Sequence, residues 1–201
     1  MPFFFWLTFP AVSFSCLVVS PPSARRHDEG ILLSMDRTRK STWEDPAPGI
    51  EAARSLSGLE YMRAIARGEA PAPPLARLLG FEVETVEEGK VTFVMDPAEY
   101  HYNPFGVVHG GIAATLFDSA LGCAVQTLLP KATMAPTMQL DINYIRPITI
   151  STGRIRCCGQ VVHLGKRSAT AEGRLVDMNG KLHAHATGTF AISELRELPT
   201  G

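Results

Sequence analysis

A carboxylate follows closely after a loop of hydrogen-bond donors, and these residue types suit the hydrolysis of an acyl group. The loop residues are Asn103, His109, Gly110 and Gly111, and the carboxylate is Asp118. Backbone N–H groups at the start of a helix favour developing negative charge, as on the oxygen of a carbonyl under attack. An oxyanion site, a neutral amide and a carboxylate are together the groups that such a hydrolysis uses.

The sequence from Ile112 to Leu129 predicts a long helix that carries Asp118 on a narrow polar stripe. Twelve of its 18 residues are apolar, and Asp118 is its only charge. At about 100° per residue, one broad apolar face packs on the rest of the fold. That face consists of Ile112, Ala113, Leu116, Phe117, Ala120, Leu121, Ala124 and Leu128. Asp118 shares its stripe with Thr115, Ser119, Gly122 and Gln126, so it is a solvated carboxylate, a hydrogen-bonded interface residue or a catalytic group.

Within one chain, the loop donors and Asp118 are too far apart to act on one carbonyl. Gly110 and Asp118 are eight positions apart, which is about 12 Å along a helix that rises 1.5 Å per residue. A second copy related by two-fold symmetry could bring the helix start of one chain to the Asp118 of the other. We therefore expect a homodimer with shared active sites.

The segments around this helix alternate as the strands of an antiparallel sheet do. Residues 81–85 and 91–95 predict a β-hairpin. The strands expected after the helix are Thr137–Ile145, Gly153–His163, Lys166–Met178 and Leu182–Ile192, with a tight turn at Asn179-Gly180. Because these strands are consecutive and joined by short links, the predicted fold class is α+β, with an antiparallel sheet wrapped around one long central helix.

Before the first strand, the sequence predicts an arm with little regular structure. Residues 36–58 are polar and are expected to form a loop, and residues 58–67 a helix. A stiff proline connector at 70–74 leads to one or two helical turns at 75–79. We divide the chain into an extension of residues 1–34, an arm and helix of residues 35–74, and a main domain of residues 75–195.

The first 34 residues differ in composition from the rest. Residues 1–20 carry no charge and hold five of the ten Phe residues. A secretory signal or a membrane anchor is one interpretation, but a basic start and a small-residue cleavage site are missing, and Pro10 and three Ser residues interrupt the apolar run. We favour a start codon assigned too early, with the protein beginning at Met35.

Composition bounds the class of protein and its partners. A chain of 201 residues with 45% hydrophobic residues fits one globular domain with an extension. The net charge of -1 argues against a nucleic-acid surface, and we expect no nucleic-acid or membrane partner. The four cysteines show no framework spacing, and a disulfide between the neighbours Cys157 and Cys158 is not expected in a strand. This suits the reducing cytoplasm.

The motif resembles the phenylacetate-degradation (PaaI) type of hotdog-fold thioesterase. The resemblance covers residues 56–192 and rests on Asn103, His109-Gly110-Gly111, Asp118, the strand Thr137–Tyr144 and His163-x-Gly165-Lys166-Arg167. It implies a hotdog fold, an active site at a dimer interface and assembly as a homodimer or a dimer of dimers. The implied activity is hydrolysis of acyl-CoA thioesters, and the scheme uses no metal or other cofactor.

The resemblance also implies a role for each matching residue. The Gly110 N–H would polarise the thioester carbonyl, His109 and Asn103 would orient that end of the site, and Gly111 would add a second backbone donor. Asp118 of the other subunit would be the nucleophile or the general base, with the Thr137 hydroxyl holding the water. Gly165, Lys166 and Arg167 would grip the nucleotide or the pantetheine arm of CoA. The motif contains no residue that selects the acyl group.

Other patterns and functions remain open alternatives. His183-x-His185 could supply half a zinc site, but without a third ligand we favour surface or interface histidines. Arg146 contacts a phosphate or forms a plain salt bridge. Ser119 has no histidine at local spacing and predicts no Ser-His-Asp triad. A hotdog dehydratase acting on 3-hydroxyacyl thioesters and a non-catalytic acyl-CoA-binding module are the competing functions.

Overall fold

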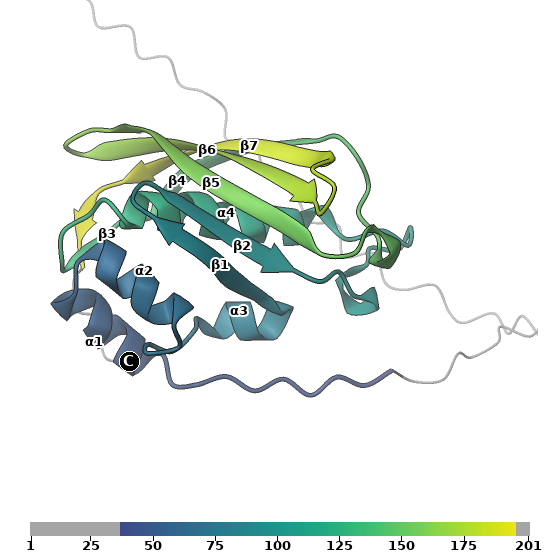
Figure 1. Ribbon diagram of the computed structural model, residues 1–201, viewed down its shortest axis with the longest axis horizontal. Coiled ribbons are helices and arrows are strands. Elements are labelled where there is room, and N and C mark those ends of the chain that lie inside the picture. Colours follow the sequence, from purple (N-terminus) through teal and green to yellow (C-terminus); the bar gives the residue numbers. More distant parts are fainter. Residues whose placement is uncertain (1–36, 196–201) are drawn as a thin grey trace, which may run out of the picture. The chain divides into compact units, whose positions relative to one another are not determined.

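A six-stranded antiparallel sheet curves across one long helix (Figure 1). The computed structural model describes residues 37–195, so the expectations for residues 1–34 lie outside the described part. Arg39 and the residues after it form one compact unit. The order of strands across the sheet is β1-β2-β5-β6-β7-β4. Their bounds are β1 Phe81–Glu87, β2 Lys90–Met95, β4 Thr137–Tyr144, β5 Ile155–Leu164, β6 Ser168–Asp177 and β7 Leu182–Ala191.

The fold class and the strands predicted from the sequence are confirmed. The predicted Asn179-Gly180 turn joins β6 to β7, and Gly180 has a φ of 77°, which only glycine adopts easily. Asp177 Oδ1 holds this turn by accepting the N–H groups of Asn179 and Lys181, both at 2.9 Å. A second, two-stranded sheet pairs β3 (Thr133–Met134) with β8 (Ser193–Glu194).

Four α-helices lie in the described part of the chain, and one of them was not predicted. They are α1 (Ala47–Ser55), α2 (Gly58–Ala66), α3 (Pro74–Leu79) and α4 (Gly110–Gln126), with short 3-10 turns at Glu99–His101 and Ile150–Thr152. The expectation of a loop over residues 36–58 was wrong for α1. Its prolines lie at the first turn, where a missing N–H breaks no helical hydrogen bond, so they start the helix instead of preventing it.

Helix α4 packs on a sheet face built from small residues. Leu116, Phe117 and Leu121 on α4 are at most 1% exposed. Opposite them the inner face of the sheet carries Gly159, Ala169, Ala171, Gly173, Ala184, Ala186 and Gly188. A Cβ atom at Gly159 would lie only 2.4 Å from the Ala120 carbonyl oxygen. The helix backbone therefore rests directly on β5, and this contact sets the depth at which α4 lies.

The helix pair α1–α2 is joined to the C-terminal end of α4. Gly58, the first residue of α2, donates its N–H to the Leu129 carbonyl at 3.0 Å. A Cβ atom at Gly58 would lie 1.7 Å from the Gln126 carbonyl oxygen, so this approach excludes any side chain. The positive end of the α2 dipole thus faces the carbonyl end of α4, which is a favourable arrangement. Figure 1 shows α1, α2 and α3 grouped beside β1.

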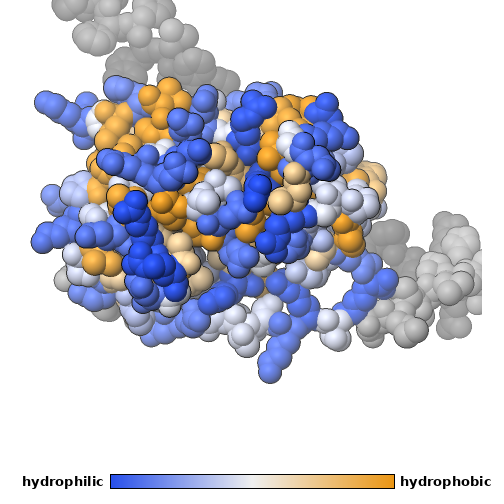
Figure 2. Space-filling view, viewed as in Figure 1, coloured by the Kyte–Doolittle hydropathy of each residue, from blue (hydrophilic) through white to orange (hydrophobic). Residues whose placement is uncertain are grey.

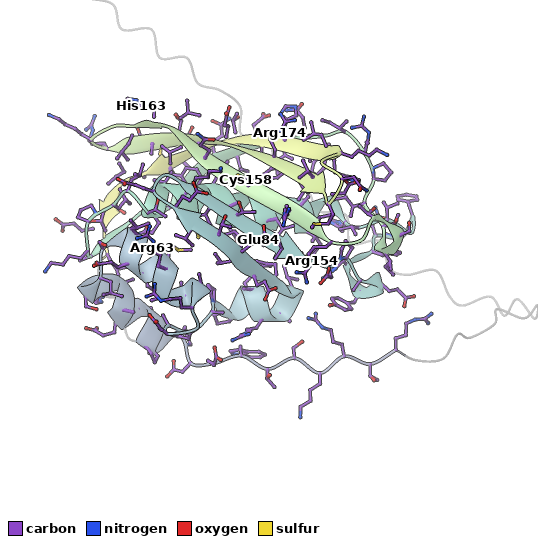
Figure 3. All side chains as sticks on the ribbon, in the orientation of Figure 1. Arg63, Glu84, Arg154, Cys158, His163 and Arg174 are labelled. Atoms are coloured by element: carbon purple, nitrogen blue, oxygen red, sulfur yellow. The ribbon has the colours of Figure 1, made fainter. Side chains whose placement is uncertain are left out.

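The outer face of the sheet is mixed in character. Figure 2 shows hydrophilic and hydrophobic residues interspersed over the face seen in Figure 1, as expected for antiparallel strands with one solvated side. Glu84 and Arg154 lie on this side of the molecule (Figure 3), where Arg156 pairs with Glu84 at 2.6 Å and Arg154 with Asp96 at 2.7 Å. Exposed pairs of this kind contribute about 0–1 kcal/mol each.

The described residues bear on two expectations, one about disulfide bonds and one about membrane-spanning helices. Cys123, Cys157 and Cys158 are free, as predicted for the adjacent pair. Between Arg37 and Leu195, none of the helices has both the length and the apolar character needed to cross a membrane.

His101 links the end of α3 to the loop that precedes α4. Its imidazole is 2% exposed; Nδ1 accepts the Ala98 N–H at 3.0 Å and Nε2 lies 2.9 Å from the Leu79 carbonyl oxygen. Its own carbonyl accepts the His109 N–H at 2.8 Å. Because Nδ1 accepts a hydrogen bond, the imidazole ring is neutral and donates from Nε2. Burial lowers the pKa of His101, against the opposing effect of the Leu79 carbonyl.

Adding one methyl group at Gly159 tests the close contact between α4 and β5. We expect Gly159→Ala to lower the free energy of unfolding by about 1–3 kcal/mol, because the new Cβ overpacks against the Ala120 backbone. Urea denaturation measures the change. Gly49→Ala in α1 is the matched control, since its Cβ would meet atoms no closer than 3.5 Å and Ala is the better helix former. A Gly159→Ala protein as stable as wild type would contradict the packing described.

The pH dependence of stability tests the neutral state of His101. Because folding lowers its pKa, the unfolded chain binds a proton at higher pH than the folded chain does. The free energy of unfolding should therefore fall as pH drops below the ordinary histidine pKa of about 6.5. In urea titrations at pH 7.5 and 5.5, we expect His101→Gln to lose part of this difference, whereas the exposed His185→Gln keeps it. Equal pH dependence in wild type and His101→Gln would refute the assignment.

Candidate active site

Asp118 is hydrogen-bonded to the hydroxyl that the sequence motif singled out. Thr137, the first residue of β4, donates from Oγ1 to Asp118 Oδ1 at 2.6 Å. Both residues are exposed in the single chain. The bond uses one carboxylate oxygen and leaves Oδ2 without a hydrogen bond in the described part of the chain. In the structure Asp118 is thus an exposed, hydrogen-bonded carboxylate that lies next to a cavity.

That cavity, here called the Asp118 cavity, has a volume of about 470 Å³ and is mainly apolar. Asp118, Ser119, Gly122, Cys123 and Gln126 from α4 form one side. Helices α1 and α2 and strands β1 and β2 form the other sides, and residues 133–137 close it. Burial, and then the charge of Asp118, raises the pKa of the Cys123 thiol to about 12. Burial also raises the pKa of Tyr61, so the cavity is a poorly hydrated environment that favours neutral groups.

The start of α4 presents one free backbone donor. His109 is the N-cap residue, and its Nδ1 accepts the Gly111 N–H at 2.9 Å. The Ile112 N–H is bonded to the His109 carbonyl at 2.9 Å. In the part of the chain that the structure describes, no acceptor receives the Gly110 N–H. The expectation of two free donors is therefore corrected to one, because the imidazole of His109 takes the second.

The start of α4 faces a separate pocket, here called the Gly110 pocket. Its volume is about 350 Å³, and His109, Gly110, Tyr144 and Arg146 are among its lining residues. It shares no lining residue with the Asp118 cavity. Asp118 and the Gly110 N–H, about 12 Å apart along the helix, thus belong to different recesses of the same chain.

Asn103 fixes the shape of its own loop. Its Oδ1 accepts the N–H of Phe105 at 2.9 Å and that of Val107 at 3.4 Å, and its backbone N–H bonds to the Val107 carbonyl at 2.8 Å. The carbonyl oxygen of the side chain is therefore used in the turn that leads to His109.

Tyr144 is a site residue that the sequence reasoning missed. Its hydroxyl donates to the Gly110 carbonyl at 3.0 Å, and its ring would lie 3.3 Å from a Cβ atom at position 110. It ties the end of β4 to the start of α4. The strand pattern showed Tyr144 as an ordinary strand residue, and the pairing with Gly110, 34 positions away, has no local signal.

The basic residues proposed for CoA lie in two places. Arg146 lines the Gly110 pocket and donates from Nη1 to the Leu182 carbonyl at 2.6 Å. Gly165, Lys166 and Arg167 form the turn between β5 and β6, next to His163 at one end of the sheet (Figure 3). Lys166 and Arg167 are exposed. The turn contributes no residue to the Asp118 cavity or the Gly110 pocket within one chain.

His183 and His185 do not act as a pair. His183 is 4% exposed, with Nδ1 3.1 Å from the Pro147 carbonyl oxygen and Nε2 3.8 Å from Asp177 Oδ2, whereas His185 is exposed. Among residues 37–195 no cluster of three His, Cys, Asp or Glu side chains could hold a metal ion.

Known proteins are similar to this chain in sequence and in fold. A family model described as the thioesterase superfamily matches residues 105–184. The 1,4-dihydroxy-2-naphthoyl-CoA hydrolase of Listeria monocytogenes is 23% identical over 123 residues, which are 61% of this chain and 98% of that protein. A conserved protein of Pseudomonas aeruginosa is 30% identical, with a TM-score of 0.57 over 61% of this chain and 95% of that one.

A phenylacetic acid degradation-related protein of Ralstonia eutropha JMP134 is also similar. It is 28% identical, with a TM-score of 0.60 over 65% of this chain and 98% of that one. These matches confirm the resemblance stated from the motif and the hotdog fold that it implied. They support thioester hydrolysis as the class of activity. The chain belongs to the thioesterase superfamily.

Proposed function

We propose that this protein hydrolyses acyl-CoA thioesters to a free acid and CoA, with Asp118 as the catalytic carboxylate. The observation that carries the proposal is the 2.6 Å bond from Thr137 Oγ1 to Asp118 Oδ1 beside a 470 Å³ apolar cavity. The bond orients the carboxylate, and the cavity offers space for an acyl group next to it. Membership of the thioesterase superfamily supports the same chemistry.

Two routes use the same groups and give the same products. As a general base, Asp118 accepts a proton from water while the water oxygen attacks the carbonyl carbon, and the C–S bond then breaks. As a nucleophile, Asp118 forms a mixed anhydride and releases CoA thiolate, and water then hydrolyses the anhydride. In both routes a backbone N–H from the start of α4 stabilises the carbonyl oxygen, a contribution of about 3 kcal/mol for one donor. Protonation of the thiolate completes the balance.

The complete site, in this proposal, combines two chains. The Asp118 cavity and the Gly110 pocket are separate recesses, so a partner must supply the donor to each Asp118. Strand β4 is an edge of the sheet, and Met138 and Tyr144 on it are 66% and 57% exposed. An exposed edge strand with apolar side chains is suited to pairing with another copy. We therefore propose a homodimer with shared sites, which can assemble further into a dimer of dimers.

The CoA portion would lie on the side of the Gly110 pocket. Among the described residues that line that pocket, Arg146 is the one Lys or Arg. Lys166 and Arg167, on the exposed β5–β6 turn of the other chain, would contact the phosphates of the nucleotide. Gly165 allows this turn to form, because a Cβ there would lie 2.9 Å from the Ser168 carbonyl oxygen. A cytoplasmic location fits a substrate carried by CoA and three free cysteines.

Replacing the carboxylate tests the proposal directly. A panel of acyl-CoA substrates is followed through release of free CoA with a thiol reagent. We expect the wild type to hydrolyse at least one of them and Asp118→Asn to lower kcat/KM by about 10²–10⁴-fold, the usual contribution of a general base. Glu172→Gln is the matched control, because Glu172 is an exposed carboxylate on β6 that lines neither the Asp118 cavity nor the Gly110 pocket. Full activity of Asp118→Asn, or no turnover by wild type, would overturn the proposed function.

A further inference from the structure

The lining of the Asp118 cavity shows which acyl groups it can hold. Among residues 37–195, its ionisable side chains are Asp118, Tyr61 and Cys123, and none of its lining residues is Lys, Arg or His. The raised pKa values of Tyr61 and Cys123 keep both groups neutral. A carboxylate on the far end of an acyl group would enter a poorly hydrated space without a cation and with Asp118 close by, which is unfavourable.

The size of the cavity sets a scale for the acyl group. At roughly 30 Å³ for each group the size of a water molecule, spaces between groups included, a volume of 470 Å³ holds on the order of ten carbon atoms. Ala53 on α1 and Ile65 on α2 are half-buried residues of its wall. Because Gly58 fixes α2 against the end of α4, this wall has a defined position.

A second cavity of about 280 Å³ lies behind part of that wall. It shares Ile65, Pro73, Phe81, Val83 and Phe93 with the Asp118 cavity. The rings of Phe81 and Phe93 pack edge to face, with centroids 5.6 Å apart. The shared residues therefore form a wall between the two cavities. Shortening the side chain of Ile65 would open this wall without changing Phe81 or Phe93.

We propose that the Asp118 cavity binds the acyl group, that this group is uncharged and apolar with on the order of ten carbon atoms, and that Ala53 and Ile65 set its maximum length. The inference rests on the proposed thioesterase function. It assigns selection of the acyl group to the helix pair α1–α2, whereas the chemistry lies on α4 and β4.

Substitutions that fill or extend the cavity test this assignment. In a panel of straight-chain, aryl and dicarboxylic acyl-CoAs, wild type should prefer decanoyl-CoA over succinyl-CoA by at least about tenfold, within the range that apolar pockets provide. Ala53→Leu fills the cavity and should lower the ratio of kcat/KM for decanoyl-CoA to that for butyryl-CoA by about tenfold. Ile65→Ala should raise the ratio for tetradecanoyl-CoA to decanoyl-CoA. Ala52→Leu, the same change at a neighbour outside the cavity, should change neither ratio.

A second readout separates this inference from the proposed function. S-decyl-CoA is a thioether without a cleavable carbonyl, so its binding, measured by isothermal calorimetry, needs no hydrolysis. Weaker binding to Ala53→Leu than to Ala52→Leu supports the cavity assignment even in a protein that cleaves no thioester. If the wild type is active but Ala53→Leu and Ala52→Leu have the same preference for chain length, the inference is wrong and the proposed function is unaffected. Preference for a dicarboxylic acyl group also overturns it.

Discussion

The backbone of α4 lies directly on β5 because Gly159 has no side chain. A single Cβ there would come within 2.4 Å of the Ala120 carbonyl oxygen. The other small residues of the inner sheet face leave room for Phe117 and Leu121, whose side chains are fully buried. Large side chains on the helix meet small residues of the sheet, and Phe190 of β7 meets Gly122 of the helix, so that both elements fill one dense core. The depth of α4, and with it the position of every group on that helix, follows from this packing.

Helix α4 presents different groups at its start, in its middle and at its C-terminal end. Its start, capped by His109, leaves the Gly110 N–H free, and its middle presents Asp118 to the Thr137 hydroxyl. Its C-terminal end holds α2 through the Leu129 carbonyl, and so positions the wall of the apolar cavity. Because a rigid helix keeps the first two groups about 12 Å apart, a single chain would hold two incomplete halves of the proposed site. Two antiparallel copies of the same helix would complete both.

Local patterns predicted much of the fold and the motif, and tertiary contacts account for the remainder. The alternation of the strands, the Asn179-Gly180 turn and the apolar face of α4 each have a local physical cause, so the sequence was sufficient for them. Helix α1 was missed because the polar composition of residues 36–58 suggested a loop, whereas its prolines lie where a helix tolerates them. The Tyr144–Gly110 bond and the cavity between α1–α2 and α4 depend on distant segments, and no local pattern encodes them.

Subunit complementation tests most directly whether one site uses two chains. Gly110→Pro removes the proposed donor at the first helical position, where proline breaks no helical hydrogen bond, although its Cβ, 3.3 Å from the Tyr144 ring, requires that ring to shift slightly. Asp118→Asn removes the carboxylate, so each homodimer should have little activity. A mixed dimer of the two variants has one site with both groups intact. Random mixing should therefore restore about a quarter of the wild-type acyl-CoA hydrolysis. A mixture no more active than the two separate variants, although mixed dimers form, would contradict the shared site.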